Sequence, residues 1–431
     1  MQQLRLLAPA SPAVVLATAV KPLLFIHIRK TAGSSLRSLL ANQFPASAIF
    51  SNAHSVQVRH RWVRIQSREN PSPTPNAQFV TGHLDFDYVD RFAQPPTVLT
   101  VLREPIALAL SAYYFYRGND EQFFSALRDD WSADVYESRR RFTNRAQQLG
   151  LRRFLIEEEA TARAWLSNVQ TRQLAGASRA DLTDNDPDLL EVALANLKRC
   201  DLVGLVERLD ETLLLLGQMM GWGRIGPMPH LNDTPFTGTD EVDAESLNVL
   251  RSWNALDLRL YDVACSLFVI KMAAAGRTRL ECPDLDETSL PDCAYFTPEQ
   301  PIRGYGWHER EFHQSRWLCW NSAPTATLAL HRTELAACSR FRCLVTHAVG
   351  PAALDGLRVS LNGAPLALQR RQQEDGYLLE GAIPPEAVIE SCGQLAGITI
   401  RCPIMQRPCD INPGSPDRRQ LGVALAWISI D

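Results

Sequence analysis

The stretch FIHIRKTAGSSLRSLL, residues 25–40, begins as an apolar strand and ends as an amphipathic helix. Its apolar start favours a buried strand that ends at Ile28. The leucines at its end recur at helical spacing, so we predict a helix that starts near Ser34. The polar turn between the two elements decides what this junction can bind.

That turn has the composition of an anion site. Free backbone N–H groups and the positive end of the helix dipole favour an anion at a helix N-terminus. Lys30 adds a full charge, Thr31, Ser34 and Ser35 supply hydroxyl groups, and Gly33 lets the backbone approach a ligand closely. The alternative interpretation is a strand-to-helix connection whose polar residues only cap the helix.

A second candidate anion site follows the next apolar run, PTVLTVLREP (96–105). This predicted strand ends at Arg103, whose planar guanidinium can pair with phosphate oxygens in bidentate fashion. We predict a helix from Pro105, and Ser111 lies about two turns into it, which leaves a tolerated core serine as the alternative. A nucleotide-triphosphate loop would need G-x-x-x-x-G-K-[ST], but Lys30 precedes the turn's glycine. The two motifs therefore favour a ligand that carries two separate phosphate groups and binds without a metal ion.

Between about residues 22 and 275, short apolar runs alternate with helical patterns. Residues 201–206 are predicted to form another strand, followed by a helix that Asp210 could cap. This alternation is typical of an α/β fold, a P-loop-like parallel sheet flanked by helices on both faces.

From about residue 290 the pattern changes to short alternating segments separated by Gly, Pro and Asn turns, which predicts a β-sandwich. Asn362-Gly363 is a typical hairpin tip. We predict an N-terminal arm (1–21), a first domain (22–275), a linker (276–292) and a β-rich accessory domain (293–431).

Composition excludes some partners. The chain has 431 residues, 45% of them hydrophobic, and a formal net charge of −4. This balance gives no general attraction to nucleic acid or to acidic membranes. Eight of the ten cysteines follow residue 281, and they are interpreted as reduced, dispersed small hydrophobes or as paired thiols if the protein is exported.

Residues 4–20 are apolar but are interrupted by Pro9 and Pro12. The segment is too short and too interrupted to span a bilayer, and an irregular arm is preferred over a signal peptide. We therefore expect no membrane span and a cytoplasmic location, with export left open. The sequence does not decide whether the chain forms a homo-oligomer.

The two phosphate-type motifs resemble those of sulfotransferases that use 3′-phosphoadenosine 5′-phosphosulfate (PAPS). IHIRKTAGSSL resembles their 5′-phosphosulfate loop and LTVLREPIALALSAYYFY their 3′-phosphate motif. Within this group, the chain is most similar to carbohydrate sulfotransferases of the heparan uronosyl 2-O type and their bacterial relatives, over roughly residues 22–270. Arg29 stands where the family usually has proline, and Glu104 where aspartate is more usual.

The resemblance implies a sulfotransferase fold, PAPS as donor, adenosine 3′,5′-bisphosphate as product and no metal. It places Lys30 at the bridging oxygen and gives Arg103 and Ser111 the 3′-phosphate. The phosphosulfate cradle would comprise Arg29, Lys30, Thr31, Ala32, Gly33, Ser34 and Ser35.

Transfer of the sulfuryl group to an alcohol also requires a general base. His83, in TGHLDF (81–86), is the candidate, because histidine titrates near working pH and the similar subgroup has a catalytic histidine in a similar motif. A lone loop histidine can also be a simple turn residue. Asp85 and Asp87 are alternatives as base or as partners that orient the imidazole.

Weaker candidates lie further along the chain. In SNVQTRQLAG (167–176), Arg172 could contact acidic substrate or donor, although a solvated helix face explains the segment equally well. His230 and Asn232 could contribute to an acceptor pocket, or form an Asx turn. Residues 137–142, ESRRRF, suggest a basic surface stripe, and the aromatic-rich stretch 304–320 suggests either sugar stacking or a sandwich core.

The sequence therefore predicts an enzyme that transfers a sulfuryl group from PAPS to a carbohydrate hydroxyl by in-line displacement, with His83 as base. The alternatives are a kinase-like phosphotransferase and a non-catalytic glycan-binding protein on a decayed transferase fold.

Overall fold

The computed structural model describes most of the chain. The described residues are 21–51, 53–58, 61–66, 72–128, 132–176, 187–223, 225–226, 242–275, 295–331, 337–388, 395–412, 414–415 and 417–431. His230, Asn232, nearly all of the predicted arm and the predicted linker lie outside them.

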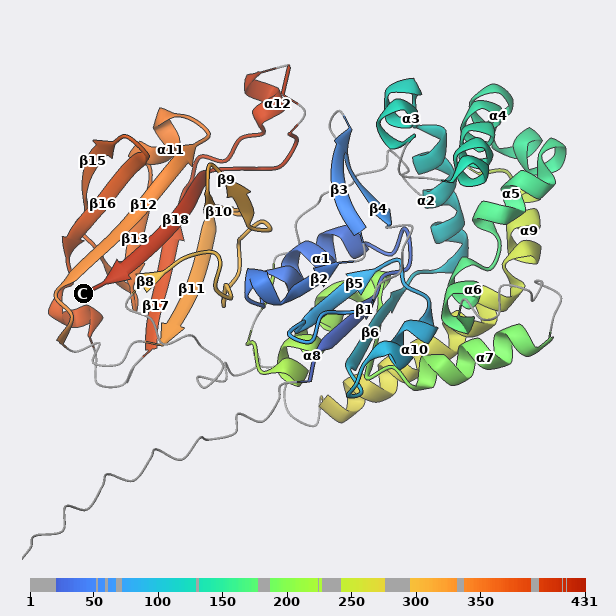
Figure 1. Cartoon of the computed structure of the whole chain (residues 1–431), viewed down its shortest axis with the longest axis horizontal. Helices are drawn as coiled ribbons and strands as arrows, with labels where there is room; N and C mark the ends of the chain where they lie inside the picture. The colour runs from blue at the N-terminus through green and yellow to red at the C-terminus, as the bar shows by residue number, and fades with distance from the viewer. Residues whose placement is uncertain are drawn as a thin grey trace, which may run out of the picture.

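The N-terminal part is built on a parallel sheet (Figure 1). Its strands are β1 (Leu23–Ile26), β2 (Ile49–Ser51), β5 (Phe79–Gly82), β6 (Thr97–Leu102) and β7 (Leu202–Leu205). They lie in the order β2-β5-β1-β6-β7, and every neighbouring pair is parallel. A separate antiparallel hairpin is formed by β3 (Ala53–Val58) and β4 (Arg61–Gln66).

Helices flank this sheet, as predicted. They are α1 (Gly33–Ala41), α2 (Pro105–Arg117), α3 (Glu121–Leu127), α4 (Ala133–Glu157), α5 (Glu159–Leu166), α6 (Val169–Ala175), α7 (Pro187–Lys198), α8 (Leu209–Met220), α9 (Ala244–Trp253) and α10 (Ala255–Ala275). In Figure 1, α1 lies on the side toward the C-terminal part, and α7 lies on the opposite side.

Local sequence explains these elements. All four residues of β1 are buried, as expected of a parallel strand covered on both faces. α2 begins at Pro105, as predicted, and the Glu104 side chain caps it by accepting a hydrogen bond from the Ala107 N–H at 2.6 Å. The predicted capping role of Asp210 is wrong, because α8 already begins at Leu209 and Arg208 takes the cap position.

The C-terminal part consists of two antiparallel sheets, which confirms the predicted β-rich region. One follows the order β15-β16-β12-β18-β10-β9, with β8 beside β18, and the other the order β11-β17-β13-β14. The strands are β8 (Tyr295–Phe296), β9 (Glu311–His313), β10 (Arg316–Trp320), β11 (Thr325–His331), β12 (Arg340–Ala348), β13 (Arg358–Leu361), β14 (Ala364–Pro365), β15 (Gln369–Gln373), β16 (Gly376–Ala382), β17 (Leu395–Arg401) and β18 (Val423–Ile430), with short helices α11 (Pro351–Asp355) and α12 (Pro408–Ile411).

Buried side chains of the two sheets form one hydrophobic cluster. Phe341 of β12 and Ile398 of β17 both belong to it, and so do Cys343 and Cys402, in agreement with the interpretation of the cysteines as small hydrophobes. Asn362-Gly363 forms the predicted tip between β13 and β14, with φ of 48° and 84°.

The aromatic-rich stretch 304–320 contributes mainly to packing. Trp307 is buried, and its indole N–H donates to the Thr327 carbonyl at 2.7 Å. His308 is buried as well, and burial lowers its pKa to about 4. Trp317 and Trp320 of β10 are half-buried. The core interpretation therefore holds for the first part of this stretch.

Residues 299–310 attach the C-terminal part to the end of α1. The buried Arg310 donates to the carbonyls of Ala41 and Phe44, both at 2.6 Å. Arg303, also buried, donates to the Gln43 carbonyl at 2.7 Å. Helix C-termini leave carbonyls unsatisfied and favour cations, so these arginines cap α1 from a distant part of the chain.

Candidate active site

Three candidate residues follow the ends of three neighbouring strands. His83 follows β5, Lys30 follows β1, and Arg103 follows β6. In the register, Ile26 lies opposite Gly82 on one side and Thr100 on the other. Because the carboxyl ends of parallel strands share one edge of the sheet, the topology brings the three loops together.

The loop after β1 has an unusual backbone. Lys30 and Ala32 have φ of 67° and 58°, which non-glycine residues seldom adopt. Thr31 is buried, and its hydroxyl donates to the Ile28 carbonyl at 2.8 Å. The N-cap residue of α1 is Ala32, whose side chain has no polar atom that could cap the helix. The positive end of the helix dipole therefore faces the space beside Lys30, where an anion is favoured.

Gly33, the first residue of α1, is required by a close contact. A Cβ atom at this position would lie 1.8 Å from Cδ2 of His27, far inside contact distance. The His27 ring is 5% exposed, so it has little room to move aside. Ser34 and Ser35 follow in the same helical turn, one partly exposed and the other buried. The loop and the start of α1 are thus fixed against the end of β1.

Arg103 contacts the same loop directly. Its Nη1 donates to the Lys30 carbonyl at 3.1 Å. Burial lowers the pKa of the guanidinium, and Glu207 and Glu104 counteract this effect, so the group remains cationic at neutral pH. The two segments predicted to bind anions are therefore in direct contact.

α2 adds the remaining member of the predicted set. Ser111 is buried, and Phe115 lies one turn further along the same face. The Lys30 ammonium lies 4.2 Å from the centroid of the Phe115 ring, a cation–π contact. The face of α2 that carries Ser111 and Phe115 is therefore the face that Lys30 approaches.

His83 is held by His27. Its Nδ1 lies 3.1 Å from the His27 carbonyl oxygen. A carbonyl can only accept, so Nδ1 carries the proton and Nε2 holds the lone pair in the neutral ring. The two imidazole rings stack with centroids 4.4 Å apart at 28°. This tautomer is the one a general base needs if it uses Nε2.

The short helix α6 supports both loops, a role that the sequence analysis missed. Gln170 accepts from the Arg103 N–H at 2.9 Å and donates to the Arg103 carbonyl at 3.0 Å. Gln173 donates to the carbonyls of His27 at 3.0 Å and Leu84 at 2.9 Å. The sequence signal for this role was the spacing of Gln170 and Gln173, because residues at i and i+3 lie on one face of a helix.

Arg172, the third polar residue of α6, lies elsewhere. Its guanidinium donates to the carbonyls of Arg163 and Ser167 at the end of α5. Arg172 also interacts electrostatically with the buried Asp257 of α10. These contacts lie on α5 and α10, whereas Gln170 and Gln173 bond to the loops.

Asp85 and Arg29 interact electrostatically with each other. Burial raises the pKa of Asp85 from 3.8 to about 6, and Asp87 adds to the shift, while Arg29 opposes it. The Arg29 guanidinium lies 5.2 Å from the centroid of the Trp165 ring. Arg29, which has no counterpart in the usual motif, is thus positioned by an aromatic ring and attracted to a carboxylate.

A buried arginine completes this aromatic region. The Arg139 guanidinium lies 3.5 Å from the ring centroid of Tyr116 and 4.6 Å from that of Trp165. Burial acts to raise the pKa of Tyr116, but Arg139 and Arg29 outweigh it and the pKa is lowered. The prediction of a basic surface stripe at 137–142 is therefore wrong for Arg139, whose long side chain packs into the core with its charge over aromatic rings.

Comparison with known proteins agrees with this geometry. The model of the galactose-3-O-sulfotransferase family matches residues 4–286. Galactose-3-O-sulfotransferase 3 of Bos taurus is 26% identical over 286 residues, which cover 60% of this chain and 59% of the relative. The Homo sapiens protein of the same name is 25% identical over 286 residues, with 60% and 58% covered. The chain thus spans about 59% of the length of the bovine relative.

The predicted class, carbohydrate sulfotransferases, is confirmed by this match. The chain belongs to the galactose-3-O-sulfotransferase family, since the family model matches well over half of its residues. The motifs resemble those of uronosyl 2-O-sulfotransferases, whereas the family model that matches the chain is that of the galactose-3-O-sulfotransferases.

The predicted cytoplasmic location is wrong. The galactose-3-O-sulfotransferases that the chain matches are Golgi membrane enzymes. Within the described residues, no helix has the length and apolar character needed to cross a membrane.

Proposed function

We propose that this protein transfers a sulfuryl group from PAPS to a hydroxyl group of a galactose-containing glycan. The main support is the hydrogen bond from Arg103 Nη1 to the Lys30 carbonyl. It joins a helix N-terminus, which favours one anion, to an arginine, which favours another. A donor with two separated anionic groups matches this pair.

Different residues of the chain bind different parts of the donor. Lys30 neutralises charge on the leaving phosphate, and the N-terminus of α1 holds the phosphosulfate with Arg29, Thr31, Ala32, Gly33, Ser34 and Ser35. Arg103 and Ser111 hold the 3′-phosphate. The residues fit such a group because the N-cap residue, Ala32, carries no acceptor that would compete with an anion for the first N–H groups of α1. PAPS supplies the sulfuryl group and leaves as adenosine 3′,5′-bisphosphate, and no metal is needed.

His83 accepts the proton of the acceptor hydroxyl at Nε2. The hydrogen bond of Nδ1 to the His27 carbonyl fixes the required tautomer. Asp85, whose pKa is raised to about 6, is a weaker base candidate and instead interacts with Arg29 near the acceptor. Arg172, His230 and Asn232 remain candidates for acceptor contacts.

The names of the curated relatives support galactose as the acceptor sugar and its 3-hydroxyl as the target. We assign residues 22–275 to a sulfotransferase fold and residues 293–431 to a β-sandwich accessory domain. The arginine contacts to the end of α1 would hold these two parts together.

Thermal denaturation with and without adenosine 3′,5′-bisphosphate tests the donor assignment. Ligand at about 100 times its Kd stabilises a native protein by about 2.7 kcal/mol, so the wild type should melt at a higher temperature. Arg103→Ala should lose most of this shift, whereas the exposed-site control Arg407→Ala should keep it. No shift of the wild type at millimolar ligand, or a shift only with Mg²⁺ and ATP, would contradict the proposal.

A further inference from the structure

Glu207 lies just beyond β7, which ends at the same edge of the sheet as β1, β5 and β6. It belongs to a 3₁₀ helix, Val206–Arg208, that continues directly from the strand. Leu102, the last residue of β6, pairs in parallel register with Leu205, the last residue of β7. Two residues further along each segment, Glu104 and Glu207 therefore come side by side, at the edge that carries the predicted anion-binding loops.

The Glu207 carboxylate bonds to the backbone just beyond this last strand pair. Its Oε1 accepts from the Glu104 N–H at 2.9 Å. Gln170 of α6 accepts from the N–H of Arg103 and donates to its carbonyl. Two side chains from distant elements therefore satisfy the backbone groups of the loop from which the Arg103 side chain extends.

Glu207 is exposed, yet each of its oxygens accepts from a donor on a different element. The Tyr261 hydroxyl of α10 donates to Oε2 at 2.7 Å. Burial and Glu207 raise the pKa of Tyr261, so the phenol keeps its proton and remains a donor at neutral pH. The neighbouring Arg208 pairs with Glu211 at 2.6 Å. Glu207 is thus fixed between the β6–α2 loop and α10.

The charge of Glu207 also acts on Arg103. Burial lowers the pKa of the Arg103 guanidinium, and Glu207 opposes this effect more strongly than Glu104 does. Both Glu207 oxygens accept from other donors, so the carboxylate stabilises the cation through space. A guanidinium carries several N–H donors, and the bond from Nη1 to the Lys30 carbonyl leaves others for a phosphate.

We propose that Glu207 is a positioning residue for the contact between Arg103 and the 3′-phosphate of the donor. This inference rests on the proposed function, which assigns that phosphate to Arg103. By holding the Glu104 N–H, Glu207 fixes the loop and pre-organises the guanidinium, and a bidentate phosphate contact depends strongly on such geometry. Glu207 therefore determines how strongly the protein prefers a nucleotide with a 3′-phosphate over one without it.

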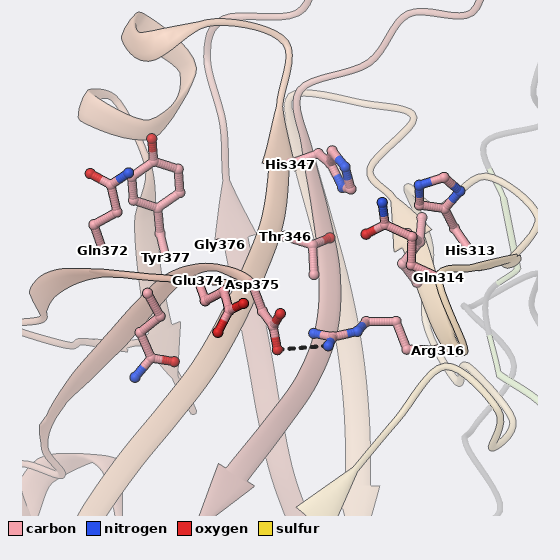
Figure 2. Close-up of a pocket in the computed structure, with 12 residues that line it drawn as sticks. His313, Gln314, Arg316, Thr346, His347, Gln372, Glu374, Asp375, Gly376 and Tyr377 are labelled. Atoms are coloured by element: carbon pink, nitrogen blue, oxygen red, sulfur yellow. Dashed lines mark hydrogen bonds and ion pairs between the residues drawn. The ribbon is translucent and has the colours of Figure 1, made fainter.

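The test is titration calorimetry of the full chain with adenosine 3′,5′-bisphosphate and with adenosine 5′-monophosphate, which lacks the 3′-phosphate. Glu207→Ala removes the acceptor of the Glu104 N–H, whereas Glu207→Gln keeps an oxygen there and removes the charge. Tyr261→Phe removes only the hydroxyl that holds Glu207. Asp375→Ala is the matched control, because it also removes a bonded carboxylate, one that pairs with Arg316 at 2.7 Å in the C-terminal part (Figure 2).

The wild type should bind the bisphosphate more tightly than the monophosphate. Glu207→Ala should weaken bisphosphate binding by about tenfold and leave monophosphate binding within about twofold of the wild type. Glu207→Gln keeps the hydrogen bond, so its bisphosphate affinity should stay within about threefold. Tyr261→Phe should weaken bisphosphate binding by about twofold or more, and Asp375→Ala should change neither affinity.

An unchanged preference in Glu207→Ala, or an equal loss of affinity for both ligands as a general loss of structure would give, would overturn the inference. Equal losses in Glu207→Ala and Glu207→Gln would assign the effect to charge and overturn it as well. If Glu207→Ala does not fold, the preference of Tyr261→Phe decides in the same way.

The two proposals fail separately. If the wild type binds the bisphosphate and Arg103→Ala does not, but Glu207→Ala binds it normally, only the role of Glu207 is wrong. A wild type that does not bind the bisphosphate would contradict the proposed function and the role of Glu207 together.

Discussion

The imidazole rings of His27 and His83 stack with their centroids 4.4 Å apart, and the His27 carbonyl oxygen lies 3.1 Å from Nδ1 of His83. One residue at the end of β1 thus fixes both the plane and the tautomer of the candidate base. The same His27 ring lies under Gly33, so it also supports the start of the helix that would hold the donor.

His83→Ala should remove the base without removing the donor site. Positioned general bases contribute about 10² to 10⁴ in rate, so we expect kcat to fall by that factor. Affinity for adenosine 3′,5′-bisphosphate, measured by titration calorimetry, should stay within about twofold. An active His83→Ala enzyme would show that another group, Asp85 first, accepts the proton.

His27 should act as a positioning residue through its ring. His27→Ala removes a buried aromatic side chain and should cost at least about 2 kcal/mol in urea unfolding, as large-to-small core changes do. His27→Phe retains a stacking ring and the backbone carbonyl, so its kcat should be much closer to that of the wild type. Equal loss of kcat in both variants, with equal stability, would contradict a role through stacking.

Gly33→Ala should disturb the donor site because of the contact with His27. The added methyl group must displace the ring, so we expect bisphosphate affinity to fall by about tenfold. Gly350→Ala, where the nearest atom to a new Cβ is 4.0 Å away, is the neutral control.

The contact between these two positions can be measured directly. If the clash is the cause, the effects of His27→Ala and Gly33→Ala should not add, with a coupling of about 0.5–3 kcal/mol in a double-mutant cycle. Simple additivity would show that Gly33 matters for another reason.

Asp85 should make stability depend on pH in an unusual direction. Its folded pKa of about 6 lies above its ordinary value of 3.8, so the unfolded chain ionises first as the pH rises. The contribution of Asp85 to stability is therefore present below about pH 4 and is lost as the pH rises to about 6. Urea unfolding from pH 4 to 7.5 should show this loss in the wild type and not in Asp85→Asn. Parallel curves for the two proteins would contradict the raised pKa.

Arg310→Ala should destabilise the N-terminal part although the residue belongs to the C-terminal part. Its guanidinium donates to the carbonyls of Ala41, Phe44, Glu299 and Gln300. Each unsatisfied buried acceptor costs about 1–3 kcal/mol, so we expect a loss of at least about 3 kcal/mol in unfolding free energy. The exposed Arg407→Ala should change stability by less than about 0.5 kcal/mol.

The sequence by itself determined the local elements and the two motif loops. Apolar runs of four to six residues followed by polar turns predicted β1 and β6, and Pro105 fixed the start of α2. These signals lie within short windows, because strand burial, helix spacing and turn chemistry depend on neighbouring residues. For the same reason the two motifs around Lys30 and Arg103 were enough to suggest a carbohydrate sulfotransferase.

Only the tertiary structure decided which residues meet. His27 contacts His83 because β1 and β5 are adjacent, and Gln170 reaches Arg103 across 67 positions. Arg29 is explained by Trp165 and Asp85, and the end of α1 by Arg310. None of these contacts leaves a local pattern, because each depends on how distant elements pack. The sequence therefore predicts the type of chemistry, and the packing of the sheet and its helices determines where the functional side chains lie.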